Sequence, residues 1–209
     1  MGFTLAGIML AIAMVGLSAA WGLGSLLQRQ QTVVASDDGG PRISQTLLGK
    51  QLSIPVSWFR DGPPRAEGFA SGIDLKLTLP LGKKGALTAI GVTLLPLSKV
   101  RPSISLLDGV YLHEFMQEEL SGPPGLVGKP LTATEGFENE TVWYDALSAT
   151  PFVAKCIAAP DGQGPAQCLR TVALSGGIAA VYSFSADVLD GWKDFDSQLS
   201  ARLDVIGAS

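Results

Sequence analysis

The stretch GIDLKLTLP, residues 72–80, alternates apolar and polar side chains one by one. Its aliphatic residues fall on one face of an extended chain and its polar residues on the other: Ile73, Leu75, Leu77 and Leu79 against Asp74, Lys76 and Thr78. A period of two is that of a β-strand with one buried face and one solvated face. The stretch therefore predicts a half-buried strand.

Other segments share its richness in β-branched and aromatic residues and are bounded by turn residues. They predict strands over residues 47–59 (interrupted at Pro55), 86–95, 141–147, 151–158, 166–174 and 177–185. Two segments instead repeat apolar residues at threes and fours, which is typical of amphipathic helices. These are DGVYLHEFMQEEL, 108–120, and DVLDGWKDFDSQLSARLDVI, 187–206.

The N-terminal segment, residues 1–28, carries no charged side chain. Its apolar run of about 25 residues would extend roughly 37 Å as a helix, against a hydrocarbon thickness of about 30 Å. A cleavable signal peptide is the alternative, but its apolar region is usually shorter and follows a basic start. The run therefore predicts an uncleaved transmembrane anchor, with the lipid bilayer as a partner.

Within this segment Gly16, Ala20 and Gly24 recur every four residues and form a ridge of small side chains. Such a ridge allows close packing with another transmembrane helix, either a second copy or part of a larger complex. The alternative is that Gly and Ala are simply common in membrane helices.

Together these patterns predict an α+β fold: a single N-terminal transmembrane helix (1–28), a flexible linker (29–46), and a mostly antiparallel β domain (47–209) packed by a short amphipathic helix and a C-terminal helix. The net charge of −4 and the absence of a basic stripe argue against nucleic acid as a partner.

Motifs for catalysis and cofactor binding are missing from the sequence. The single histidine, His113, lies on the polar side of its predicted helix and has no second histidine at zinc-binding spacing. No GxSxG elbow, phosphate-binding loop or dinucleotide fingerprint occurs. Carboxylate pairs such as Asp187 with Asp190 are explained by the electrostatics of a helix start. We therefore expect no enzyme activity, no cofactor and no metal.

The loop SWFRDGPPRAEG, residues 57–68, combines Trp58 with Arg60 and Arg65. These residue types favour protein interfaces and anionic ligands, so the loop is a possible interaction site. The alternative is that the aromatic side chains pack inward and the arginines satisfy local partners.

The two cysteines, Cys156 and Cys168, are twelve residues apart and flank the turn-rich stretch AAPDGQGP. This spacing is not that of a CxxC redox motif, and one histidine with two cysteines falls short of a structural zinc site. A hairpin centred on Gly162 would place the cysteines opposite each other, close enough for a disulfide. A disulfide indicates an oxidising compartment.

Several strings of this chain resemble those of uncharacterised alphaproteobacterial exported proteins. They are LSIPVSWFR, GIDLKLTLP, VTLLPLSKVRPSISLLDGVY, PFVAKCIAAP with CLRTVAL, and VYSFSADVLDGW, and they cover most of residues 47–195. The chain departs from the pattern at Leu79-Pro80, where an aromatic residue often precedes the proline, and in a longer loop at 121–130. The resemblance implies an anchored periplasmic protein and no established activity.

Two functions fit these observations. The first is a non-catalytic interaction protein, held in the bacterial inner membrane by one helix with its C-terminal domain in the periplasm, that binds or stabilises a membrane or envelope complex. The alternative is a periplasmic small-ligand-binding or weakly hydrolytic domain that uses surface carboxylates, His113 or the arginine loop. A deep pocket lined by those groups would favour the alternative.

Overall fold

The computed structural model describes residues 40–64, 66–133, 139–159 and 164–209. They belong to a compact unit that runs from residue 39 to the C-terminus. The strands are β1 (Arg42–Leu47), β2 (Lys50–Pro55), β3 (Gly68–Phe69), β4 (Ile73–Leu79), β5 (Thr88–Pro96), β6 (Leu120–Ser121), β7 (Val127–Pro130), β8 (Glu140–Tyr144), β9 (Val153–Ile157), β10 (Gln167–Ala173) and β11 (Ile178–Ser185).

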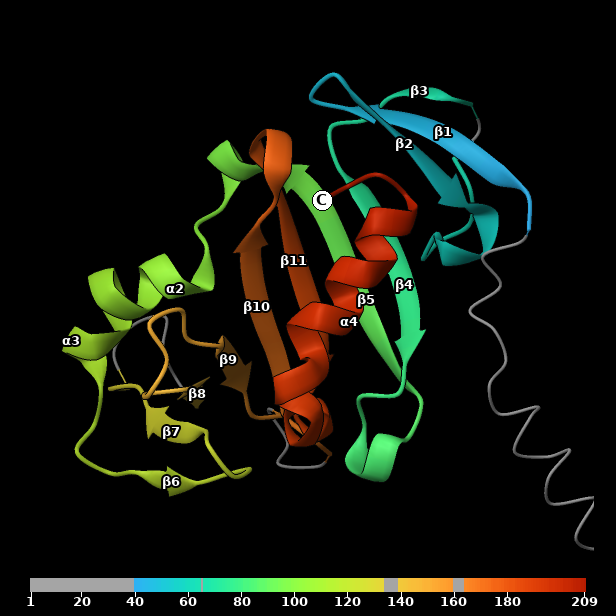
Figure 1. Ribbon diagram of the computed structural model, residues 1–209. Helices are drawn as coiled ribbons and strands as arrows, with labels where there is room; N and C mark the ends of the chain where they lie inside the picture. Colours follow the sequence, from blue (N-terminus) through green and yellow to red (C-terminus); the bar gives the residue numbers. More distant parts are fainter. Residues whose placement is uncertain (1–39, 65, 134–138, 160–163) are drawn as a thin grey trace, which may run out of the picture. The chain divides into compact units, whose positions relative to one another are not determined.

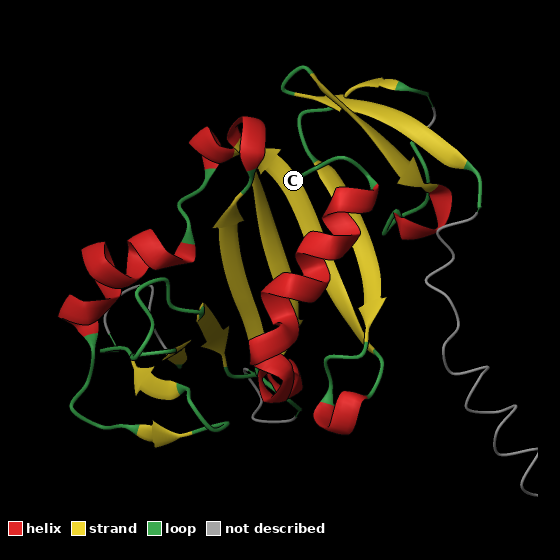
Figure 2. Cartoon of the chain, in the orientation of Figure 1, coloured by secondary structure: helices red, strands yellow, loops and turns green. Residues whose placement is uncertain are grey.

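The helical elements are short, apart from the last (Figure 2). The α-helices are α2 (Ser103–Leu106), α3 (Leu112–Glu114) and α4 (Trp192–Val205). The tighter or wider turns are η1 (Val56–Trp58), η2 (Lys83–Gly85), η3 (Leu97–Lys99), the π-helical turn η4 (Leu107–Tyr111), η5 (Ser175–Gly177) and η6 (Ala186–Gly191).

Eight of the strands form one antiparallel sheet in the order β4-β5-β11-β10-β9-β8-β7-β6, and β2-β1-β3 form a second, three-stranded sheet. Figure 1 shows α4 lying along one face of the large sheet, with α2 and α3 beside the β8–β9 end. The predicted α+β fold with a mostly antiparallel sheet is therefore confirmed for the described residues.

Strand β4 has the alternation that its sequence predicts. Its four aliphatic side chains are at most 4% exposed, and the three polar residues between them are exposed. Because neighbouring strands keep this register, Val92 of β5 and Tyr182 of β11 face the same way as Leu75. This face of the sheet forms the main core.

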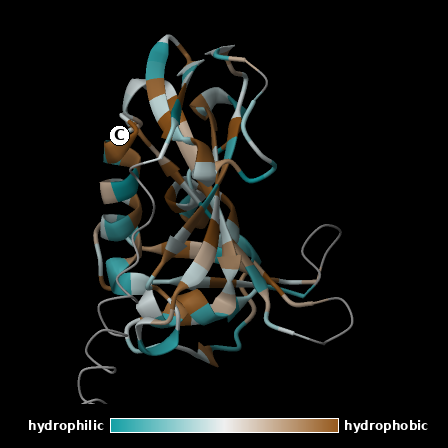
Figure 3. Ribbon diagram, turned by 90° about the vertical axis from the view of Figure 1, so that its right-hand side faces the viewer, coloured by the Kyte–Doolittle hydropathy of each residue, from teal (hydrophilic) through white to brown (hydrophobic). Residues whose placement is uncertain are grey.

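Helix α4 covers that core with a stripe of apolar side chains. Figure 3 colours the ribbon by hydropathy and shows hydrophobic and hydrophilic residues alternating in bands along this helix. Phe195 is fully buried, and its ring centre lies 4.8 Å from that of Phe184 and 5.5 Å from that of Tyr182. The predicted helix over 187–206 is in fact η6 followed by α4. Gly191 at their junction lies so close to Leu81 that a Cβ there would be 2.7 Å from the Leu81 carbonyl oxygen.

Among the described residues, helical elements cover the opposite face of the sheet at its β8–β9 end, where α2 also contacts β10. Leu107 and Tyr111 from η4 pack there against Val142 and Val153, and these residues form a second, smaller apolar cluster. The predicted helix over 108–120 is wrong in its bounds. The helical segment begins at Ser103, after Pro102, and ends at Glu114, where Phe115 turns extended and pairs with Leu131.

The predicted flexible linker over 29–46 also needs correction, because Arg42–Leu47 form β1. β1 and β2 make a hairpin joined by Leu48 and Gly49, whose φ angles are 53° and 81°. Two positive φ angles are typical of a tight type I′ hairpin turn. The single strand predicted over 47–59 missed this turn, because Leu is rare in that conformation.

The prediction of a membrane-spanning helix also needs correction. Among the described residues, no helix is both long and apolar enough to cross a membrane. The predicted anchor over 1–28, with Gly16, Ala20 and Gly24, lies outside these residues. The single-pass inner-membrane location, which depended on that helix, is therefore not supported.

Candidate functional site

The two cysteines form a disulfide, as the sequence predicts. Cys156 of β9 and Cys168 of β10 are direct partners in the antiparallel register, and their side chains face the main core. They are 2% and 0% exposed. Reactive cysteines need exposure and a thiolate, so this bond is structural.

A row of residues crosses the face of the large sheet that α4 does not cover. The register pairs Lys76 with Gly91, Gly91 with Ser183, Ser183 with Leu169, and Leu169 with Lys155. We call this row, together with Ile157 and Arg60, the open face. Antiparallel sheets often leave one face to solvent, but such a face is usually polar.

The open face exposes apolar side chains near its centre. Leu169 is 42% exposed and Ile157 is 40% exposed. They are diagonal neighbours across β9 and β10, on either side of the stem of Lys155. The three side chains therefore form a small apolar patch with a cation in it.

Arg60 reaches the open face from the segment that follows η1. The backbone N–H of Arg60 donates a hydrogen bond to the backbone carbonyl of Asp74, 3.1 Å away. A Cβ at Gly91 would lie 2.5 Å from the Arg60 Nη2 and would collide with the hydroxyl of Ser183. The guanidinium group therefore rests against the strand backbone where Gly91 has no side chain.

Gly91 is a residue that the sequence analysis missed. The signal was present, because a glycine inside a strand pattern marks a bulge or a close approach. Here it is a close approach, of the Arg60 side chain.

Lys155 forms an ion pair with Glu140, with 2.6 Å between its Nζ and the Glu140 Oε1. Glu140 is only 6% exposed, and its Oε2 is buried without a hydrogen-bond partner among the described residues. Burial, and secondarily the charge of Glu140, raises the pKa of Tyr111 to about 12. The pair thus sits at the border between the open face and the cluster under η4.

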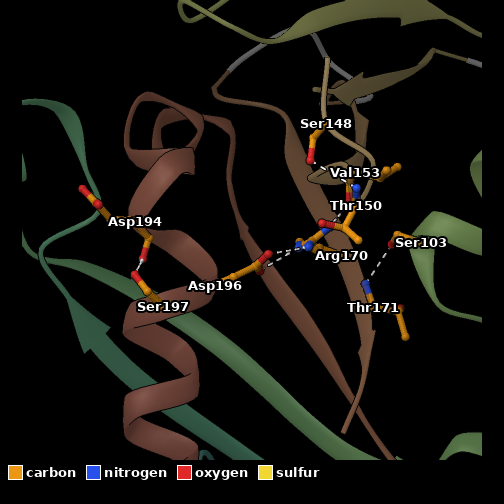
Figure 4. A network of polar contacts seen from close by, with 9 residues as sticks. All are labelled: Ser103, Ser148, Thr150, Val153, Arg170, Thr171, Asp194, Asp196 and Ser197. Atoms are coloured by element: carbon orange, nitrogen blue, oxygen red, sulfur yellow. Dashed lines mark hydrogen bonds and ion pairs between the residues drawn. The ribbon is translucent and has the colours of Figure 1, made fainter. Parts of the chain in front are cut away.

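A second charged group, Arg170, is buried on the α4 side of the sheet (Figure 4). Its guanidinium group donates two hydrogen bonds to Asp196 of α4, at 2.9 and 2.6 Å, and one to the carbonyl of Val153, at 3.0 Å. It also lies 4.5 Å from the ring centre of Phe152. Arg170 therefore joins α4 to β9 and β10, and it is not available to a partner.

The predicted interaction loop is only partly present at the surface. Trp58 is 4% exposed and belongs to the main core, so of the two alternatives for this aromatic residue the structure has the inward one. Arg60 is exposed on the open face, and Arg65 lies outside the described residues. His113 is exposed on α3, and the described residues contain no group of three His, Cys, Asp or Glu side chains placed to hold a metal.

A pocket of about 450 Å³ lies on the α4 side of the sheet, beside the disulfide. Trp143 of β8 lines this pocket, and so do Asp187 and Asp190 of η6. Lys83 of η2 and Asn139 are also among the lining residues. The structure therefore brings the carboxylate pair that the sequence singled out into a pocket, but without His113 or Arg60.

No protein-family model and no curated protein matches this chain. One similar solved structure is an immunity protein of the Stenotrophomonas maltophilia type IV secretion system, with 12% identity and a TM-score of 0.51. The match covers 79% of this chain and 91% of that one. A second is an iron-regulated outer membrane lipoprotein of Neisseria meningitidis, with 10% identity, a TM-score of 0.45, and coverage of 76% and 90%. At such identities the first match shows a shared fold, and the resemblance to alphaproteobacterial exported proteins stays a prediction.

Proposed function

We propose that this chain is a non-catalytic binding protein of an oxidising compartment, and that it binds another protein through the open face. The observation that carries this proposal is the exposed patch of Leu169 and Ile157 on an otherwise regular sheet. Exposed apolar side chains gathered at one place, with polar groups around them, are a common mark of protein interaction sites.

The chemistry of the open face fits a protein partner better than a small molecule. An antiparallel sheet is rigid, so its side chains lose little further freedom when a partner docks. Arginine is enriched in protein interfaces, and Arg60 lies on the backbone at Gly91, in the same row as Leu169. Lys155, 22% exposed, already pairs with Glu140, so covering its stem does not leave its charge without a counter-ion.

The disulfide supports the proposed location in an oxidising compartment. Disulfides persist in secreted and periplasmic proteins and are rare in the cytosol. The buried Cys156–Cys168 bond joins the two strands that carry Leu169 and Ile157. The open face is therefore built on a covalently closed hairpin.

The shared fold also supports the proposal. The similar chain from Stenotrophomonas maltophilia is described as an immunity protein of a secretion system. This description supports a binding role for the present chain. The hydrolytic alternative would need His113, Arg60 and the carboxylates in one site. The structure places them apart, on α3, at the β4 edge and on η6.

Site-specific photo-crosslinking in the cells that make the protein tests this function. A photoreactive amino acid replaces Leu169, and the matched control replaces Val205, which is 46% exposed on α4 at the other side of the sheet. We expect a covalent adduct with a second protein from position 169 and none from position 205. No adduct at 169, or the same adducts from both positions, would refute the proposal.

A charged variant then tests the patch itself. Leu169→Glu should lower the adduct yield from a photoreactive group at Ile157 at least about tenfold, because a carboxylate would have to be buried against the partner. Val205→Glu should leave it unchanged. Both variants should keep the unfolding midpoint, since substitutions of exposed residues usually change stability by less than about 0.5 kcal/mol.

A further inference from the structure

The pocket beside the disulfide is separate from the open face, because its lining residues face the other side of the sheet. Thr141, Trp143 and Cys156 line it, whereas Val142 and Lys155 point to the opposite face. Its volume of about 450 Å³ is within the usual range for small-molecule sites, roughly 300 to 1,000 Å³.

The aromatic wall of this pocket is held in place by two glycines. A Cβ at Gly128 would lie 2.5 Å from the Trp143 ring, and a Cβ at Gly122 would collide with it. The indole therefore fits against bare backbone at Gly128 of β7 and at Gly122, the residue that follows β6. Trp143 is nevertheless only partly buried, and it is one of the residues that line the pocket.

The charges around the pocket favour a cation. Asp187 and Asp190 are both exposed and line it from η6, whereas the described lining residues include one lysine, Lys83 of η2. No ion pair joins Lys83 to either carboxylate among the described residues. Tryptophan is the aromatic residue that attracts cations most strongly, and carboxylates accept hydrogen bonds from N–H groups.

From the pocket, its fixed indole and its two carboxylates we infer a binding site for a small organic cation, an alkylammonium or alkylguanidinium group. The cation lies against Trp143 and donates its N–H hydrogen bonds toward Asp187 and Asp190. Lys83 opposes it as a like charge. This inference does not depend on the partner of the open face.

Binding is measured on the full chain by a chemical-shift titration of the tryptophan indole N–H signals. The probe is agmatine, which carries a guanidinium and an ammonium group, and the neutral control is 1,4-butanediol. The Trp143 signal is assigned by its loss in Trp143→Phe. We expect that signal to shift and saturate below about 50 mM agmatine while the buried Trp58 does not respond.

Three variants test whether a carboxylate at the pocket strengthens binding of the cation and the lysine weakens it. Asp190→Asn should raise the dissociation constant about fivefold, and Lys83→Gln should lower it about twofold. Asp108→Asn is the matched control, because it removes one exposed carboxylate from η4 on the other side of the sheet and should change binding by less than about 1.5-fold.

Several results would overturn the site. They are an equal response to 1,4-butanediol, no saturable shift of Trp143, an equal effect of Asp108→Asn and Asp190→Asn, or weaker binding by Lys83→Gln. Loss of the crosslinks at the open face with normal agmatine binding would refute the proposed function alone.

Discussion

Removing the disulfide should cost a large part of the stability of the folded unit. The bond closes a loop between residues twelve apart in sequence, Cys156 and Cys168. In the chain-entropy model a loop of this length contributes about 3 kcal/mol, because the crosslink restricts the unfolded chain. For a domain of this size 1 kcal/mol corresponds to roughly 2 to 4 °C, so the melting temperature should fall by about 6 to 12 °C.

Urea unfolding of the double variant Cys156→Ala/Cys168→Ala, followed by circular dichroism, measures this loss. Wild-type protein with a thiol reductant should show a similar decrease in the free energy of unfolding, since both lack the crosslink. The double variant should not respond to the reductant. A loss below about 1 kcal/mol, or a reductant effect that persists in the double variant, would show that the loop-closure reasoning is wrong for this hairpin.

Three further outcomes are expected. The Phe195 ring is fully buried and contacts three other rings, so Phe195→Ala should lower the free energy of unfolding in urea by about 3 to 5 kcal/mol. The control Val205→Ala should lower it by less than about 0.5 kcal/mol. Similar values for the two variants would contradict the packing around α4. Gly91→Ala should displace the flexible end of Arg60 and turn the Ser183 hydroxyl aside, with a stability change below about 1 kcal/mol, but it should weaken crosslinking from position 169; unchanged crosslinking would exclude Arg60 from the interface. The raised pKa of Tyr111 favours its neutral form in the folded state, so its contribution is complete below about pH 10 and is lost as the pH rises to about 12. Tyr111→Phe should lessen the loss of unfolding free energy over that interval, and a loss as large as that of the wild type would disprove this role.

Patterns of period two and period 3.6 predicted β4 and the C-terminal helix, but they missed β1 and gave the wrong bounds for the helix over 108–120. β4 was predicted with its buried and exposed residues, because alternation is a property of the extended backbone itself. The facing cysteines followed from their equal distances to a turn. The short strands β3, β6 and β7 were missed, since two to four residues carry no measurable period.

The candidate sites were less accessible to sequence reasoning. Arg60 was named, but it was grouped with Trp58, which the fold buries. Gly91 and Leu169 were not named, because their importance comes from strand neighbours that are far apart in sequence. The sequence explained the Asp187 and Asp190 pair by a helix start. The pocket that these residues line also needs Trp143, which the fold brings there from a distant part of the sequence.

The sequence by itself determined the α+β class, the register of the disulfide hairpin and the apolar stripe of α4, because each depends on local periodicity or spacing. Only the tertiary structure decided which sheet face stays open, where Arg60 rests and what surrounds Trp143. These depend on the order β4-β5-β11-β10-β9-β8, in which residues up to about ninety positions apart, such as Gly91 and Ser183, become neighbours. Strand order is set by the packing of the whole chain, and local patterns do not encode it.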